Sequence, residues 1–170
     1  MNIQKYSKLM VTLHWISALV ICWALVSGFY TGLLPVNPEI KKWVAFVNVS
    51  VGTLFIPVFI LRFYARQTHV RPAPSSGKPF EQLTAALVQS LIYGTVSLVL
   101  VTGVLMMERP INVFNAISIP NLINDPRWLA ALFTVHEVAC ALLAVLVVMH
   151  IAGVIKHEVS GARIIQRMSL

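Results

Sequence analysis

Acidic side chains are scarce in this chain. It has six Asp and Glu among 170 residues, and charged residues of both signs make up 11%. A typical soluble domain has about 25% charged residues, so this composition excludes an ordinary soluble protein. The only acids within or beside an apolar segment are Glu108 and Glu137. Paired-carboxylate and Ser-His-Asp catalysis therefore have little support.

Cysteine is also rare. Cys22 and Cys140 both fall within apolar segments, so no disulfide framework is expected and buried free thiols are the simplest interpretation. No CxxC occurs, and the dipeptide His136-Glu137 is followed by Cys140 where an HExxH motif needs a second histidine. The sequence thus gives little support to a zinc site.

Long apolar runs are what the chain has instead. Hydrophobic residues make up 58% of it, and the mean hydropathy is +0.79. Four segments of about 20 residues or more can each cross a bilayer: residues 11–32, 44–64, 83–107 and 129–155. Alternating apolar-polar dyads are absent, and helices satisfy their own backbone groups in lipid. We expect an all-α fold, a four-helix transmembrane bundle that forms one domain over residues 1–170.

The connections differ in character. The first, LPVNPEIKK, is short and rich in proline, and the second, RQTHVRPAPSSGKPF, is predicted to be irregular. The third, residues 108–128, is moderately apolar and has no clear secondary-structure pattern, and we interpret it as a cap along the membrane interface. The basic N-terminus leads into an apolar run too long for a signal peptide, which favours a retained first span.

The basic residues indicate the orientation. They lie beside the apolar segments and are not interleaved with stacking aromatics, so no nucleic-acid binding is expected. Nine are on the side of the termini: Lys5, Lys8, Arg62, Arg66, Arg71, Lys78, Lys156, Arg163 and Arg167. Four are on the other side: Lys41, Lys42, Arg109 and Arg127. The positive-inside rule then predicts that both termini are cytoplasmic.

Three histidines lie inside apolar segments. His136 and His150 are fourteen residues apart, about 21 Å along a helix and close to four turns, so both face the same side. His14 in the first segment is at the depth of His150. Opposed imidazoles from two helices can hold a haem b between them. A hydrogen-bonded core histidine is the alternative for each one singly.

Several motifs together resemble the small bacterial cytochrome b561 family. They are the opening KYSKLMVTLHW, NVSVGTLFIPVFILRFYAR, LIYGTVSLVLVTGVLMM, and HE…MHIAGVIKH followed by IIQRM. The likeness covers nearly the whole chain and implies a multi-pass protein of the bacterial inner membrane with two haems b. By this resemblance His14 and His150 match the ligands of the cytoplasmic-side haem. His136 matches one ligand of the periplasmic-side haem.

The sequence departs from that family at the second ligand of the outer haem. Asn48 stands where the second span should carry a histidine, and Gln89 replaces a histidine common in the third span. An amide is a poor iron ligand. Three outcomes stay open: a haem held by His136 alone, a substitute ligand such as Met106 or Met107, or no outer haem. His69 cannot substitute, because it follows the second span on the cytoplasmic side.

Further candidates lie near the cytoplasmic face. His157 is two turns beyond His150, and with Thr12 it could hold a quinone carbonyl. Arg62 and Arg66 could bind haem propionates or a quinone headgroup, although they could equally just mark the cytoplasmic side. Four glycines within the spans could allow close approach of helices or a macrocycle: Gly28, Gly52, Gly103 and Gly153.

The function expected is electron transfer between the quinone pool and a donor or acceptor at the periplasmic face. The resemblance implies one possible activity, superoxide oxidation with ubiquinone reduction, and the four outer basic residues could steer an anion. Whether the protein is an enzyme stays open. One alternative is a non-enzymatic haem-binding anchor that docks a redox partner through residues 111–128, and another is a structural protein that has lost haem.

Overall fold

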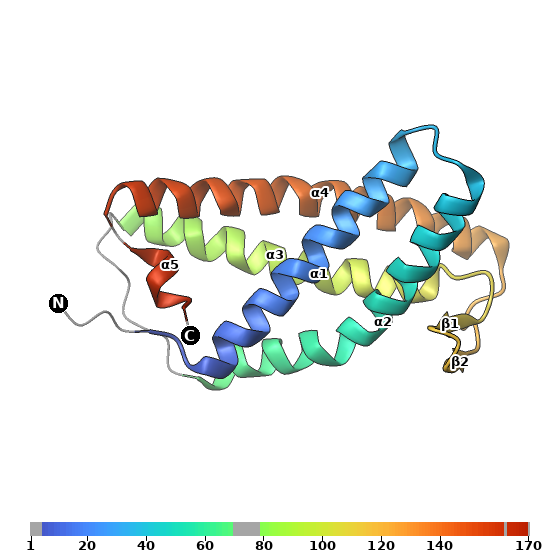
Figure 1. The fold of residues 1–170 in the computed structure, drawn as a ribbon, viewed down its shortest axis with the longest axis horizontal. Helices are drawn as coiled ribbons and strands as arrows, with labels where there is room; N and C mark the ends of the chain where they lie inside the picture. Colours follow the sequence, from blue (N-terminus) through green and yellow to red (C-terminus); the bar gives the residue numbers. More distant parts are fainter. Residues whose placement is uncertain (1–4, 70–78, 162, 170) are drawn as a thin grey trace.

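The computed structural model describes residues 5–69, 79–161 and 163–169. Four long helices dominate: α1 (Lys8–Leu33), α2 (Pro38–Thr68), α3 (Pro79–Leu105) and α4 (Pro126–Val159). A short helix α5 (Ile164–Arg167) and two strands, β1 (Ile111–Val113) and β2 (Ile117–Ile119), complete the described part (Figure 1). All four helices are long and apolar enough to cross a membrane, which confirms the predicted fold class. The third helix ends two residues before the predicted segment does, at Leu105.

Local sequence sets where three of the helices begin. The Ser7 hydroxyl accepts a hydrogen bond from the backbone N–H of Met10 at the start of α1. Asn37 and Asp125 cap α2 and α4 in the same way, and each is followed by a proline at the first helical position. A proline has no N–H to leave unsatisfied there. Helices α2 and α4 therefore start with the same cap, and both start at the same end of the bundle (Figure 1).

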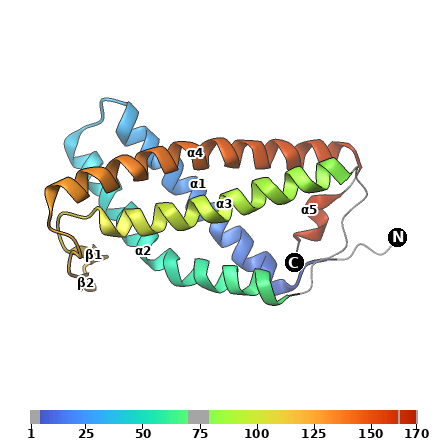
Figure 2. The same cartoon turned by 180° about the vertical axis from the view of Figure 1, so that it is seen from behind.

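The helices pack mainly as two pairs, α1 with α2 and α3 with α4, and α2 joins the pairs through a smaller contact with α3. Figure 2 shows α3 and α4 running side by side. The apolar core that links the pairs is Phe55, Phe59, Tyr93, Val96 and Leu143. Only about a fifth of each span is buried inside the protein. The outward apolar faces are available to contact lipid, as expected for a multi-pass membrane protein.

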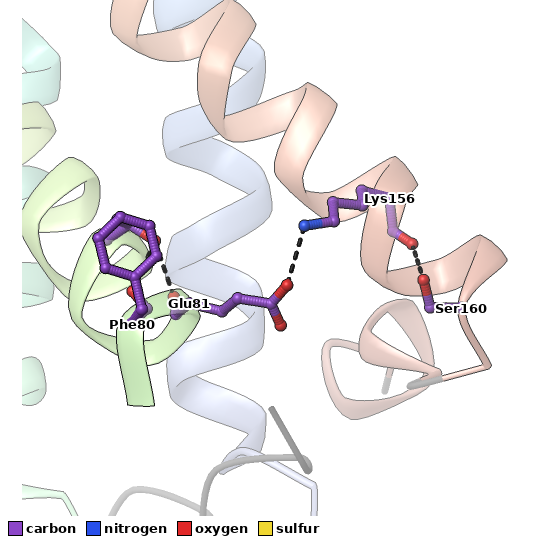
Figure 3. Close-up of polar contacts among 5 residues, drawn as sticks. Phe80, Glu81, Lys156 and Ser160 are labelled. Atoms are coloured by element: carbon purple, nitrogen blue, oxygen red, sulfur yellow. Dashed lines mark hydrogen bonds and ion pairs between the residues drawn. The ribbon is translucent and has the colours of Figure 1, made fainter. Parts of the chain in front are cut away.

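Both ends of the described chain lie at one end of the bundle, here called the terminal end (Figure 1). The backbone N–H of Tyr6 donates to the carbonyl of Arg167, and the indole N–H of Trp15 donates to the carbonyl of Met168 at 2.9 Å. Lys156 of α4 pairs with Glu81 of α3 at 2.9 Å (Figure 3). These contacts fix the terminal ends of three helices and the C-terminal segment together.

The opposite end, here called the hairpin end, carries a β-hairpin in the third connection. Strands β1 and β2 are antiparallel, with Val113 opposite Ile117. Phe114 and Asn115 form the turn with φ of 47° and 57°. No clear pattern predicted this hairpin, because the usual Asn-Gly or Asp-Gly turn signal is missing and a phenylalanine occupies a left-handed position.

Helix α2 anchors this hairpin. The hydroxyl of Ser50, which is 0% exposed, donates to the carbonyl of Asn112 at 3.2 Å and accepts from the N–H of Phe114 at 3.1 Å. The ring of Phe114 packs edge-on against Phe46, one turn earlier on α2, with centroids 5.9 Å apart. The hairpin is thus held against one face of α2. Most of the second connection, predicted to be irregular, lies outside the described residues.

Ser50→Ala tests this anchor. The substitution leaves the carbonyl of Asn112 and the N–H of Phe114 without their partner, and because both bonds are only part-buried the cost is near the ordinary net value of about 1 kcal/mol per hydrogen bond. We expect faster proteolysis within residues 108–125 and a lower thermal midpoint for the purified protein. Thr134→Ala is the matched control, since Thr134 is exposed and its hydroxyl donates to the carbonyl of Ala130 in its own helix. Equal proteolysis of the two variants would contradict the anchoring role.

Candidate functional site

Each long helix carries a pair of candidate site residues fourteen positions apart. Fourteen residues span about 21 Å, close to four turns, so the two members of a pair share a face at two depths. The members nearer the terminal end, here called the terminal level, are His14, Arg62, Gln89 and His150. The members nearer the hairpin end, here called the hairpin level, are Gly28, Asn48, Gly103 and His136. The spacing seen in α4 from sequence thus recurs in all four helices.

The structure brings His14 and His150 together at the terminal level. Their ring centroids are 6.5 Å apart, and the ring planes are inclined at 60°. An imidazole nitrogen binds a metal at about 2 Å, so two imidazoles on opposite sides of one metal ion have centroids about 6 Å apart. The separation of this pair therefore fits a single iron between the two rings.

Arg62 contacts the same pair. Its Nη2 lies 2.9 Å from Nδ1 of His14. A guanidinium only donates, so Nδ1 of His14 accepts in this contact and its Nε2 carries the proton. Iron bound at Nε2 would require the proton on Nδ1. The donor set of the pair fits haem, and ligation through Nε2 of His14 would require Arg62 to leave Nδ1.

A small cavity adjoins the histidine pair at the terminal end. It is lined by Tyr6, Met10, His14, Arg62, Arg66, Gln89, Tyr93 and Met168. The guanidinium carbons of Arg62 and Arg66 lie 5.3 and 4.2 Å from the centre of the Tyr93 ring. Two cations beside one aromatic ring give this cavity a positive lining, which is the chemistry that anionic or carbonyl oxygens require. Thr12 and His157 do not line it, and Thr12 is exposed.

At the hairpin level, Thr102 of α3 orients His136 of α4. Its hydroxyl donates to the carbonyl of Leu98 at 2.7 Å and lies 3.0 Å from Nδ1 of His136. Since the single hydroxyl proton is used, Thr102 accepts from Nδ1–H, and Nε2 of His136 keeps a free lone pair. Metal-binding histidines are commonly held in this tautomer by such a partner. Thr102 was not predicted as a site residue from the sequence, although it directly precedes Gly103, which was.

Gly103 allows this arrangement. A Cβ placed on Gly103 would stand 3.2 Å from Cε1 of His136, tighter than ordinary van der Waals contact. The other three glycines singled out from the sequence, Gly28, Gly52 and Gly153, have no atom of the described residues within 4 Å of that position. Close packing therefore explains the glycine at 103 alone.

Asn48 has a partner on the neighbouring helix. The hydroxyl of Ser27, which is 7% exposed, lies 2.9 Å from Oδ1 of Asn48 as a donor and also 2.7 Å from the carbonyl of Trp23. Asn48 is ten residues after the first residue of α2, and His136 is ten residues after the first residue of α4. Both side chains therefore lie at similar depth below the hairpin end, about 15 Å along their helices.

The comparison with protein families gives one match. The profile described as prokaryotic cytochrome b561 matches residues 5–169, nearly the whole chain. No curated protein matches the chain.

Gly103→Ala tests the contact with His136. The added methyl group meets the imidazole at 3.2 Å, so we expect a displaced ring and a lower thermal midpoint, equivalent to about 1–3 kcal/mol of overpacking. Gly94→Ala on the same helix has no neighbour within 4 Å, and there the better helix propensity of alanine should raise stability by up to about 1 kcal/mol. Equal midpoints for the two variants would show that Gly103 is not required for packing.

Proposed function

The chain belongs to the prokaryotic cytochrome b561 family, and from that membership we propose that it carries electrons between ubiquinone and a donor at the periplasmic face. The family is one of membrane b-type cytochromes, so haem b binding and electron transfer follow from membership itself. What we propose beyond family membership is which residues bind the haem iron, that the quinone is ubiquinone, and that the electron donor acts at the periplasmic face. The observation that carries the ligand assignment is the 6.5 Å separation of the His14 and His150 ring centroids.

His14 and His150 are the proposed axial ligands of a haem b at the terminal level. Haem supplies the one-electron chemistry, and the protein supplies ligands, burial and orientation. Each histidine is only partly exposed and comes from a different helix pair, α1 from one and α4 from the other. A haem bound by both histidines would link the α1–α2 pair to the α3–α4 pair. The helices of the two pairs make few direct contacts with one another.

Arg62 and Arg66 are proposed to bind anionic or carbonyl oxygens in the terminal cavity. Once His14 donates through Nδ1, the Arg62 guanidinium is repelled from that nitrogen and its donors are free for a haem propionate or a quinone oxygen. Thr12 and His157 stay candidates for a quinone only if it approaches from outside this cavity. Arg62 is the quinone candidate that the cavity itself contains.

The distribution of basic residues supports a cytoplasmic location for the terminal end, in the bacterial inner membrane. The hairpin end would then face the periplasm, where the proposed electron donor is superoxide. Arg109 and Arg127 could steer an anion there, whereas Lys42 is paired with Glu39 at 2.9 Å. This pairing weakens the field that Lys42 contributes.

A second candidate is an anchoring subunit for a soluble redox partner. The hairpin region exposes large apolar side chains, and Ser50 fixes the hairpin against α2. A fixed apolar surface of this kind is what docking a partner requires. The exposed side chains are Phe114, Ile117, Leu122 and Trp128. Fast superoxide-dependent ubiquinone reduction by the isolated protein supports the enzyme, and stable copurification of a soluble cytochrome or dehydrogenase supports the anchor.

Replacing the proposed ligands tests the terminal haem. We expect His14→Ala and His150→Ala each to remove the low-spin haem spectrum, because a single imidazole cannot fill both axial positions. His69→Ala is the matched control, since His69 also lies at the terminal end and bonds to Ala65 of its own helix. Haem content is measured by the pyridine haemochrome assay. An unchanged low-spin spectrum in both ligand variants would contradict the assignment.

Arg62→Gln tests the quinone contact. A hydrogen bond from a charged donor contributes about 1.5–3 kcal/mol, so the half-saturating ubiquinone concentration should rise at least about tenfold with little change in maximal rate. Arg163→Gln, in the turn before α5, is the control and should leave both parameters unchanged. A fall in maximal rate alone would place Arg62 away from the quinone.

A further inference from the structure

We infer that the segment after α4 is a lid on the terminal cavity, which opens by local release from the bundle and so controls when a ligand enters from the terminal end. The lid is residues 163–169, which include α5. The inference rests on the proposed function only in treating this cavity as a binding site. The position of the lid and its release are tested without any ligand.

The backbone after α4 turns to bring the lid across the terminal end of the bundle (Figures 1 and 2). Helix α4 ends at Val159, and Gly161 follows with φ of 83°. Arg163, the first residue of the lid, has φ of 47°, a left-handed conformation that is unfavourable for a residue with a Cβ. These two left-handed residues redirect the chain, so the lid does not continue along the axis of α4.

The lid forms part of the wall of the terminal cavity. Met168 from the lid and Tyr6 from the segment before α1 line this cavity together with His14 and Arg62. The N–H of Tyr6 donates to the carbonyl of Arg167 at 3.1 Å, which joins the two segments to each other. Both segments lie at the terminal end of the bundle (Figure 1). Together they therefore close the cavity on that side.

Polar contacts, and not apolar packing, hold the lid in place. The indole N–H of Trp15 donates to the carbonyl of Met168 at 2.9 Å, and the carboxylate of Glu158 accepts from the N–H of Ile165 at 3.1 Å. No residue from 163 to 169 is buried. Segments with few buried contacts are the ones that open at the lowest free energy in a folded protein. The lid therefore opens while the helices behind it stay folded.

The charges of the lid suit an anionic ligand. Residues 163–169 carry two basic side chains, Arg163 and Arg167, and no acidic one. The cavity behind the lid is lined by Arg62 and Arg66. A ligand with anionic or carbonyl oxygens is therefore attracted both at the lid and inside the cavity, whereas a cation is repelled. The lid controls access for the same class of ligand that the cavity favours.

The test measures how fast a thiol placed inside the cavity reacts. Gln89, which lines the cavity, is changed to cysteine in the purified full-length protein, with Cys22 and Cys140 changed to serine. A negatively charged maleimide labels position 89 only after entering the cavity. Trp15→Phe removes the hydrogen bond to Met168 and so raises the open population of the lid. The net contribution of one hydrogen bond corresponds to an increase in labelling rate of about fivefold.

Trp23→Phe is the matched control, because Trp23 lies on the same helix and is exposed to a similar extent, 43% against 53% for Trp15. It should leave the labelling rate unchanged. A chain that ends at residue 162 lacks the lid and should label at least as fast as Trp15→Phe. Trypsin cleavage after Arg163 should increase in Trp15→Phe in parallel with labelling, since one opening exposes both positions. Circular dichroism checks that every variant keeps its helix content.

Two results would overturn the inference. Equal labelling rates with and without residues 163–169 would show that this segment does not close the cavity. Faster trypsin cleavage of Trp15→Phe without faster labelling would show that the segment opens but controls no entrance. Failure of added ubiquinone to slow the labelling in any variant would instead contradict the quinone contact of the proposed function, and it would leave the lid unaffected.

Discussion

An ionisable side chain within the lipid interior needs a partner, and the structure depends on how its histidines meet this requirement. Placing such a group at the centre of a bilayer costs from about 2.5 kcal/mol upward, so it is retained where it pairs or binds something. His14 and His150 meet one another and Arg62 at the terminal level. His136 meets Thr102 at the hairpin level. The helix pairs and their connections place these groups at two depths.

The two levels are built differently. At the terminal level, histidines from α1 and α4 face each other across the gap between the helix pairs, with a cationic cavity alongside. At the hairpin level, each polar pair stays within its own helix pair: Ser27 with Asn48, and Thr102 with His136.

Hydropathy alone was sufficient to predict the four helices, because lipid requires long apolar segments with internally satisfied backbones. The spacing of His136 and His150 predicted their common face, and the family match confirms the resemblance inferred from the motifs. The hairpin was missed because its turn residues, Phe114 and Asn115, lack the usual glycine. Thr102 and Ser27 were missed because the hydroxyls of Ser and Thr in a helix ordinarily bond to their own backbone, and only packing shows a second partner.

An experimental structure of the membrane-extracted protein, with anomalous scattering recorded at the iron edge, tests the central claim most directly. The account predicts an iron peak between the rings of His14 and His150, about 2 Å from Nε2 of each, with flat density around it. Rings that lie apart with no iron peak between them, in protein that retains its haem colour, would contradict it.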